Sequence, residues 1–216
     1  MPLEACIFDL DGVVVDTVPL HFQAWKRMFN EYGHEFTFDD YKRKVDGIPR
    51  YDGARAILTG LSEKDLRTAA DKKQLYFREL LDAAEIPVYD TTIALIDSLI
   101  SAGIKVAVIS SSRNCPHILK RIGLYDRLGA VISGDDIAKG KPDPEIFLAA
   151  AERLGASPEN CIAFEDAVLG VEAAKNGKMK CVGIDRYDNP GRLAMADAVI
   201  ADAGETSVER LRELMP

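Results

Sequence analysis

Six short apolar runs, separated by longer amphipathic segments, constrain the fold of this chain more than any other feature. Each run is only a few residues long and rich in Val, Ile, Ala and Cys, which is typical of strands buried on both faces. The runs are residues 5–10, 105–110, 130–133, 161–164, 180–184 and 198–200. Strands that alternate with helices form parallel sheets covered on both faces. We therefore predict an α/β fold with a doubly wound, Rossmann-like parallel sheet.

Several segments between these runs carry the signals of amphipathic helices. In residues 92–102, apolar side chains recur at helical spacing and the pattern stops before Gly103. Pro144 opens a second such segment, which runs to Gly155. The order of the chain is therefore strand, helix, strand over most of its length.

Residues 16–87 break this alternation, because they contain no convincing strand. Phe22, Trp25 and Phe29 mark an apolar helix face, and Ser62 resembles the start of a capping box ahead of a second long helix. We predict an all-helical cap domain of residues 16–87, inserted into a core of residues 1–15 and 88–216. Ligands of open α/β sheets bind beyond the carboxyl ends of the strands, so we expect the cap to cover the site.

The charge and composition narrow the classes of partner. The chain of 216 residues carries a net charge of −8, which argues against binding to a nucleic-acid backbone. It has no apolar stretch of transmembrane length, and its first residues do not form a secretory signal. The four cysteines form no metal-binding pair, so we expect buried thiols. We expect a cytoplasmic monomer that acts on a small molecule and binds neither nucleic acid nor membrane.

Two acids stand at the end of the first run, in the sequence Phe8-Asp9-Leu10-Asp11-Gly12. The alternation of a strand sends both carboxylates to the same side, and the glycine allows a sharp turn. Carboxylates this close repel each other unless a cation lies between them, and Mg²⁺ prefers such oxygen ligands. The alternative is that these are two solvated acids at a strand end. The residues at the other strand ends decide between the two interpretations.

Three further runs lead into residues of complementary chemistry. Residues 110–112 are serines, whose hydroxyl and amide groups suit a phosphate oxygen. Lys141 lies in a Gly-Lys-Pro-Asp-Pro turn that aims its amine, and Glu165 and Asp166 offer further metal ligands. Each feature alone has a plainer explanation as a helix cap, a solvated lysine or surface acids. Together, four strand ends present Asp/Asp, Ser, Lys and Glu/Asp in that order.

This order resembles the haloacid dehalogenase-like superfamily of phosphotransferases over essentially the whole chain, and the cap matches the subclass with a helical cap after the first motif. The resemblance implies that Asp9 is the nucleophile that forms an aspartyl-phosphate and that Asp11 is its acid/base partner. Asp11 also excludes the dehalogenase members, which lack this acid. The other implied roles are phosphoryl binding by Ser110 and the amide of Ser111, charge neutralisation by Lys141, and Mg²⁺ binding by Asp9, the Asp11 carbonyl, Asp166 and Glu165.

Within that superfamily, the cap resembles the β-phosphoglucomutase family. The resemblance rests on His21-Phe-Gln-Ala-Trp25 after the two acids and on Gly47-Ile-Pro-Arg50 downstream. It implies that His21 pairs with Asp11 and that Arg50 binds the distal phosphate of the substrate. A lone histidine beside an aromatic stripe is otherwise more often a packed or surface residue. The further substrate-binding residues that it implies are Trp25, Lys72, Ser111, Ser112, Arg113 and Asn114.

Three functions are weighed for these residues, two of them enzymatic. The leading hypothesis is interconversion of β-glucose 1-phosphate and glucose 6-phosphate, or of a close hexose analogue, through a sugar bisphosphate. The alternative is a sugar-phosphate phosphatase, in which water accepts the phosphoryl group from Asp9. His21 and Arg50 favour the mutase. A non-catalytic phosphate sensor is the third hypothesis, and the inserted cap and Asp11 argue against it.

Overall fold

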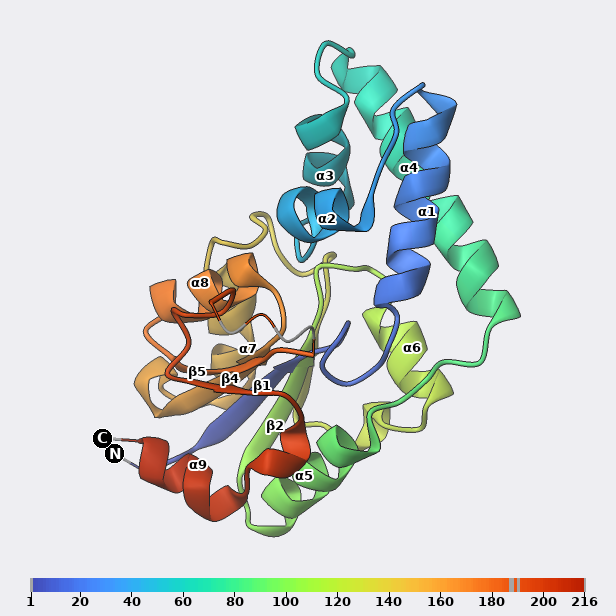
Figure 1. The fold of residues 1–216 in the computed structure, drawn as a ribbon. Coiled ribbons are helices and arrows are strands. Elements are labelled where there is room, and N and C mark those ends of the chain that lie inside the picture. Colours follow the sequence, from blue (N-terminus) through green and yellow to red (C-terminus); the bar gives the residue numbers. More distant parts are fainter. Residues whose placement is uncertain (1, 187–188, 190, 216) are drawn as a thin grey trace.

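The core of the protein is a six-stranded sheet in which all neighbouring strands are parallel, as seen in a computed structural model that describes residues 2–186, 189 and 191–215 (Figure 1). The strand order is β3-β2-β1-β4-β5-β6. The strands are β1 Ala5–Asp9, β2 Lys105–Ile109, β3 Ala130–Ile132, β4 Cys161–Glu165, β5 Lys180–Ile184 and β6 Ala198–Ile200. Each predicted strand is confirmed, with its ends placed to within one residue.

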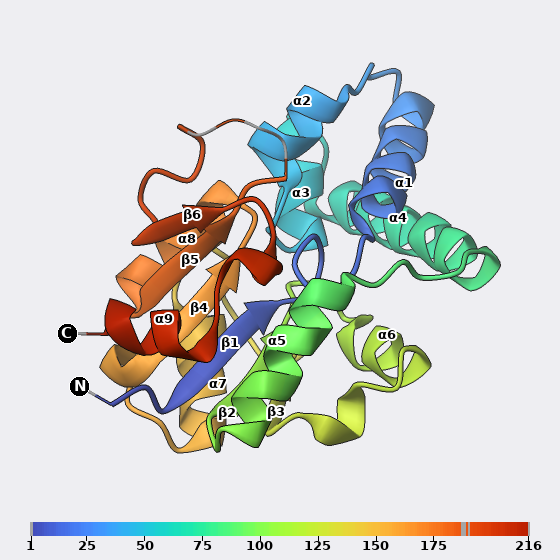
Figure 2. The ribbon, with the colours of Figure 1, turned by 60° about the horizontal axis from the view of Figure 1, so that its bottom comes forward.

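Two layers of helices cover the sheet, because side chains alternate along each strand. The covering helices are α5 Asp90–Ser101, α6 Cys115–Arg121, α7 Glu145–Leu154, α8 Val168–Asn176 and α9 Val208–Leu214. In β1, Ala5 and Ile7 join the apolar cluster under α7 and α8. Cys6 and Phe8 join the opposite cluster, which includes residues of α5, α6 and α9. Figure 2 shows α5 and α9 in front of the sheet. The predicted doubly wound arrangement is thus confirmed.

A group of helices lies between β1 and α5 in the chain and over the carboxyl ends of the strands in space (Figure 1). They are α1 Val18–Glu31, α2 Phe38–Asp40, the π-helical turn η1 Tyr41–Val45, α3 Arg50–Ile57 and α4 Glu63–Ala83. The long helices α1 and α4 pack along each other, and the Ser62 hydroxyl caps α4 by accepting a hydrogen bond from the Asp65 amide. None of residues 16–87 belongs to a strand, so the prediction of an all-helical cap is confirmed.

The chain enters and leaves the cap at adjacent points. The Asp16 amide donates a hydrogen bond to the Pro87 carbonyl at 2.9 Å, and Val15 forms an isolated antiparallel bridge with Val88. Val15 also bridges to Asp11, just beyond the end of β1. The two connections border residues 16–87 and place the base of the cap beside the predicted catalytic acids.

The rest of the described chain consists of connections and short turns. These include the 3₁₀ turns η2 Tyr125–Arg127, η3 Pro158–Asn160 and η4 Ala203–Glu205. All four cysteines are free and buried, as predicted. Within the described residues, every helix is too short or too polar to cross a membrane.

Candidate active site

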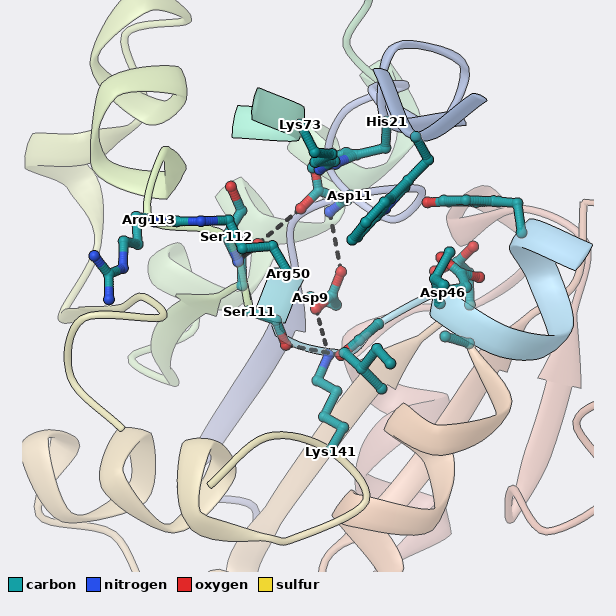
Figure 3. A pocket seen from close by; sticks show the side chains of 18 of the residues that line it. Asp9, Asp11, His21, Asp46, Arg50, Lys73, Ser111, Ser112, Arg113 and Lys141 are labelled. Carbon is teal, nitrogen blue, oxygen red and sulfur yellow. Dashed lines mark hydrogen bonds and ion pairs between the residues drawn. The ribbon is translucent and has the colours of Figure 1, made fainter. Parts of the chain in front are cut away.

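Asp9 is the last residue of β1, in the middle of the sheet, and its side chain is nearly fully buried. The Lys141 ammonium lies 2.6 Å from Asp9 Oδ1, and the Asp11 amide donates to Asp9 Oδ2 at 3.0 Å (Figure 3). Burial alone would lower the pKa of Lys141, but the charges of Asp9 and Glu165 outweigh it and raise that pKa. The charged form of Lys141 is therefore favoured, and its ammonium faces the carboxylate that was predicted as nucleophile.

Asp11 lies in a different environment. Its carboxylate accepts hydrogen bonds from the hydroxyls of Thr17 and Ser110, the latter at 2.7 Å, and His21 Nε2 lies 3.2 Å from Asp11 Oδ1. Burial would raise the pKa of Asp11, but His21 and the hydroxyl hydrogen bonds outweigh it and hold the pKa well below its usual range. Asp11 is thus an ionised carboxylate that can accept a proton from an attacking hydroxyl.

The serine turn after β2 joins the core to the cap. Ser110 Oγ accepts a hydrogen bond from the Ser112 amide at 3.0 Å while it donates to Asp11. Ser111 Oγ donates to the Gly47 carbonyl of the cap at 2.7 Å. The turn therefore orients Asp11 and contacts the cap at the same time, in addition to its predicted place beside the phosphoryl group.

Asp9, Glu165 and Asp166 form a buried acidic cluster, in which carboxylate oxygens of all three lie within 4.8 Å of one another. They meet because β1 and β4 are neighbouring strands that end at the same edge. Gly12 allows the close approach: its φ is +89°, and a Cβ there would lie 2.6 Å from Asp166 Oδ2. Carboxylates this crowded repel one another unless a cation lies among them, and hard divalent cations bind such oxygen donors. The Asp11 carboxylate stands outside this cluster.

The cap supplies a buried chain of groups that ends on Asp11. Lys73 Nζ lies 2.8 Å from His21 Nδ1, on the far side of the imidazole from Asp11 (Figure 3). The imidazole stacks on Phe77 with ring centroids 3.9 Å apart, and Lys73 Nζ lies 5.0 Å from the Trp25 ring centroid. Burial lowers the pKa of His21, and it lowers the pKa of Lys73 to about 7. The position of Asp11 therefore depends on the cap as well as the core.

One pocket at the junction of cap and core brings most of the predicted residues together. Those on its wall are Asp9, Asp11, His21, Trp25, Arg50, Ser110, Ser111, Ser112, Arg113, Lys141, Glu165 and Asp166. Asn114 is not on this wall. It is buried behind it, where its amide group hydrogen-bonds to Gln74 and Ser112.

Two arginines extend the pocket into a neighbouring cavity of about 280 Å³. Arg50, from the start of α3, pairs with Asp71 at 3.2 Å, and Arg113 pairs with Asp135 at 2.8 Å. Arg67 of α4 lines the same cavity. The neighbouring cavity is therefore basic, which suits the distal anionic group of a substrate.

Lys72, which was predicted to bind the substrate, does not line the pocket, whereas its neighbour Lys73 does. Lys72 Nζ pairs with Glu31 at 3.0 Å on the exposed side of α4. The buried face of α4 repeats at helical spacing through Leu66, Ala69, Ala70, Lys73 and Phe77. The helical period would have identified Lys73, because it lies on the apolar face and Lys72 does not.

Other residues at the site were missed because no local pattern marks them. Thr17 bonds to Asp11, Gln74 lies on the pocket wall, and Asp46 lines it from the cap. Their roles depend on how the cap sits on the core, which periodicity within one segment does not encode.

Comparisons with known proteins agree with this geometry. A family model of haloacid dehalogenase-like hydrolases matches residues 3–178. The β-phosphoglucomutase of Bacillus subtilis (strain 168) is 36% identical, over 98% of this chain and 95% of its own length. The phosphorylated carbohydrates phosphatase of Thermotoga maritima is 35% identical, over 99% and 100%.

A solved structure gives the same result at the level of the fold. The crystal structure of β-phosphoglucomutase from Clostridium difficile superimposes with a TM-score of 0.91 at 29% identity, covering 99% of this chain and 97% of that one. Family model, relatives and fold all extend over the strand ends that carry the acids, the serine turn and Lys141. The chain is therefore an enzyme that belongs to the haloacid dehalogenase-like hydrolase family.

Proposed function

We propose that this enzyme moves a phosphoryl group between two positions of a sugar phosphate through an aspartyl-phosphate on Asp9, as a β-phosphoglucomutase. The observation that carries the proposal is the contact between His21 Nε2 of the cap and Asp11 Oδ1, at 3.2 Å. Because a cap residue holds the acid/base group, the site is complete only when the cap lies over the core. Such a closed site favours a bound sugar hydroxyl over water as the acceptor.

The chemistry proceeds in two balanced half-reactions. In one, an oxygen of Asp9 attacks the phosphorus, the bond from phosphorus to the sugar oxygen breaks, and Asp11 gives that oxygen the proton that it took up in the other half-reaction. In the other half-reaction, a sugar hydroxyl attacks the phosphorus, gives its proton to the ionised Asp11 and releases Asp9. Lys141, 2.6 Å from Asp9, offsets the negative charge on the nucleophile and the phosphoryl group.

We further propose that the divalent metal is Mg²⁺, held by Asp9, Asp166 and the Asp11 carbonyl, with Glu165 beside them. The all-oxygen donor set and its burial fit this ion. Bound there, Mg²⁺ would supply positive charge between the nucleophile and the phosphoryl group. Glu165 also contacts Lys141 and accepts a hydrogen bond from the Ala167 amide at 3.0 Å, and these two contacts fix its carboxylate.

Residues 16–87 would form the cap that selects the substrate. Arg50 and Arg113 are suited to bind the second phosphate of a sugar bisphosphate, because guanidinium groups pair well with phosphate. Ser112 and Trp25 lie on the pocket wall, where they can contact the sugar ring. We propose that the enzyme works as a monomer in the cytoplasm.

A sugar-phosphate phosphatase is the second candidate, and a specific observation favours it. The Thermotoga maritima relative named as a phosphatase is 35% identical over the whole chain, nearly the same as the Bacillus subtilis mutase. Overall similarity therefore supports both activities equally. The choice rests on the residues that hold Asp11 and the distal phosphate.

One assay separates the two activities. The enzyme is incubated with β-glucose 1-phosphate, Mg²⁺ and a trace of glucose 1,6-bisphosphate, and glucose 6-phosphate and free phosphate are measured together. We expect glucose 6-phosphate with little free phosphate, and no product from the Asp9→Ala variant. Release of phosphate without glucose 6-phosphate would show the phosphatase instead.

A further inference from the structure

The cap places a lysine against the acidic cluster of the core. Lys42 comes from η1, and its Nζ lies 3.2 Å from Asp166 Oδ2. The same ammonium contacts the carboxylate of Asp46, one helical turn further along the cap. These side chains are almost fully buried, with exposed fractions of 11% for Lys42, 8% for Asp46 and 4% for Asp166. Lys42 therefore forms a buried ion pair between cap and core.

Asp166 is one of the three acids proposed to hold Mg²⁺, so the ammonium and the metal share a carboxylate. Two cations beside one buried carboxylate repel each other strongly, because little water is present to screen them. Asp166 can therefore contribute to Mg²⁺ binding only to the extent that the Lys42 ammonium moves away from it. Lys141 also lies beside two acids of this cluster, Asp9 and Glu165, but it belongs to the core and so does not link the metal site to the cap.

The surroundings give Lys42 a place to move. A cavity of about 520 Å³ lies beside it, between the cap and the start of α8. Asp46 and Asp39 of the cap line this cavity, together with Arg43, which pairs with Asp39, and Arg192, which pairs with Asp185. The ammonium can leave Asp166 and extend toward solvent while it stays paired with Asp46. The movement therefore does not create an unpaired buried charge.

We infer that Lys42 acts on the metal site through Asp166. Its ammonium competes with the divalent cation for this carboxylate and so couples metal binding to the contact between cap and core. This inference rests on the proposed metal site. By linkage, a cation that displaces Lys42 from Asp166 weakens this cap contact, and the contact weakens binding of the cation by the same factor.

Isothermal titration of the metal-stripped protein with MgCl₂, without substrate, tests the coupling. Lys42→Met removes the charge and keeps the apolar stem, so we expect Mg²⁺ to bind roughly tenfold more tightly, which corresponds to about 1.4 kcal/mol. Lys42→Arg keeps the charge and should bind Mg²⁺ about as the wild type does. Lys42→Gln provides a second neutral variant, with the same tightening expected, should the methionine variant not fold.

Lys44→Met is the matched control. Lys44 belongs to the same turn, its Nζ pairs with Asp40 at 2.7 Å, and its side chain is half exposed. Its loss changes the net charge by the same amount, so an unchanged Mg²⁺ affinity is expected. If both Lys42→Met and Lys42→Gln bind Mg²⁺ no more tightly than Lys44→Met does, the coupling is overturned while the proposed metal site stands. Absence of Mg²⁺ binding by the wild type would overturn the proposed metal site, and the coupling with it.

Discussion

At the scale of single residues, the two proposed catalytic acids differ because their partners differ. Asp9 faces Lys141 and belongs to the acidic cluster. The Asp11 carboxylate is held by Thr17, Ser110 and His21 and stands outside that cluster. One strand end therefore carries one carboxylate suited to bind phosphorus and metal and another suited to move a proton.

This division predicts the behaviour of Asp11→Asn. The amide cannot accept the proton of the attacking hydroxyl, so phosphoryl transfer should slow by roughly 10²- to 10⁴-fold. Mg²⁺ affinity should change by less than about twofold, because the carboxylate is not part of the acidic cluster. Steady-state kinetics and Mg²⁺ titration measure the two effects. A large loss of Mg²⁺ affinity would show that the ligand set is wrong.

Lys73 predicts a pH dependence of stability. Burial, with a smaller contribution from the charge of Arg50 and opposed by Asp11, lowers its pKa from 10.5 to about 7. Between pH 7 and 10 the unfolded state thus binds a proton that the folded state does not, so this group makes unfolding less favourable as pH rises, by up to about 1.4 kcal/mol per pH unit. Lys73→Met removes this contribution.

Urea unfolding at pH 7, 8 and 9 checks the sign. The free energy of unfolding of the wild type minus that of Lys73→Met should increase over this range by on the order of 2 kcal/mol. The neighbouring exposed lysine gives the control, since the corresponding difference for Lys72→Met should stay flat. A Lys73 difference that is flat or falls with pH would mean that this ammonium stays charged in the fold.

At the scale of secondary-structure elements, the sequence predicts what depends on local patterns. The strands were placed to within one residue because a few buried β-branched residues bounded by turns leave little freedom. The convergence of Asp9, Ser110 and Glu165 followed from the shared edge of parallel strands. The choice between Lys72 and Lys73 needed the phase of α4, which the spacing of its apolar residues contains.

Contacts between cap and core are the part that local patterns do not encode. The ion pair of Lys42 with Asp166 joins residues 124 positions apart, and the bond of Ser111 to Gly47 joins residues 64 apart. Each depends on the angle at which the cap lies on the sheet. A helical period fixes which face of a helix is buried but not what lies opposite.

Gly170 tests how closely α8 packs on the end of β4. A Cβ at this position would collide with the carboxylate of Glu165. Gly170→Ala should therefore lower the free energy of unfolding by about 1–3 kcal/mol and weaken Mg²⁺ binding, although alanine is the better helix former.

Gly177→Ala, at the other end of α8, is the control, because a Cβ there meets its nearest neighbours at 3.4 Å, an ordinary contact. It should leave the free energy of unfolding and the Mg²⁺ affinity nearly unchanged, as judged by urea unfolding and Mg²⁺ titration. A stable Gly170→Ala protein with wild-type Mg²⁺ affinity would show that Glu165 has room to move.

At the scale of the whole molecule, an acidic protein concentrates cations at one junction. The chain carries a net charge of −8, yet Lys73, Lys141, Arg50 and Arg113 all line the pocket between cap and sheet. The same wall also carries Asp9, Asp11, Asp46, Glu165 and Asp166, so the pocket contains both signs of charge. The position of each charged group around the pocket therefore matters more for binding an anionic ligand than the net charge of the chain.

The central claim is that the phosphoryl group passes through Asp9. The direct measurement is to mix the enzyme with glucose 1,6-bisphosphate and Mg²⁺, quench in acid, reduce the acyl phosphate with borohydride and locate the reduced residue by peptide mass spectrometry. We predict reduction at Asp9, and no reduced residue in the Asp9→Ala variant, which should also have lost turnover. Reduction at another residue, or turnover retained by Asp9→Ala, would contradict the covalent mechanism.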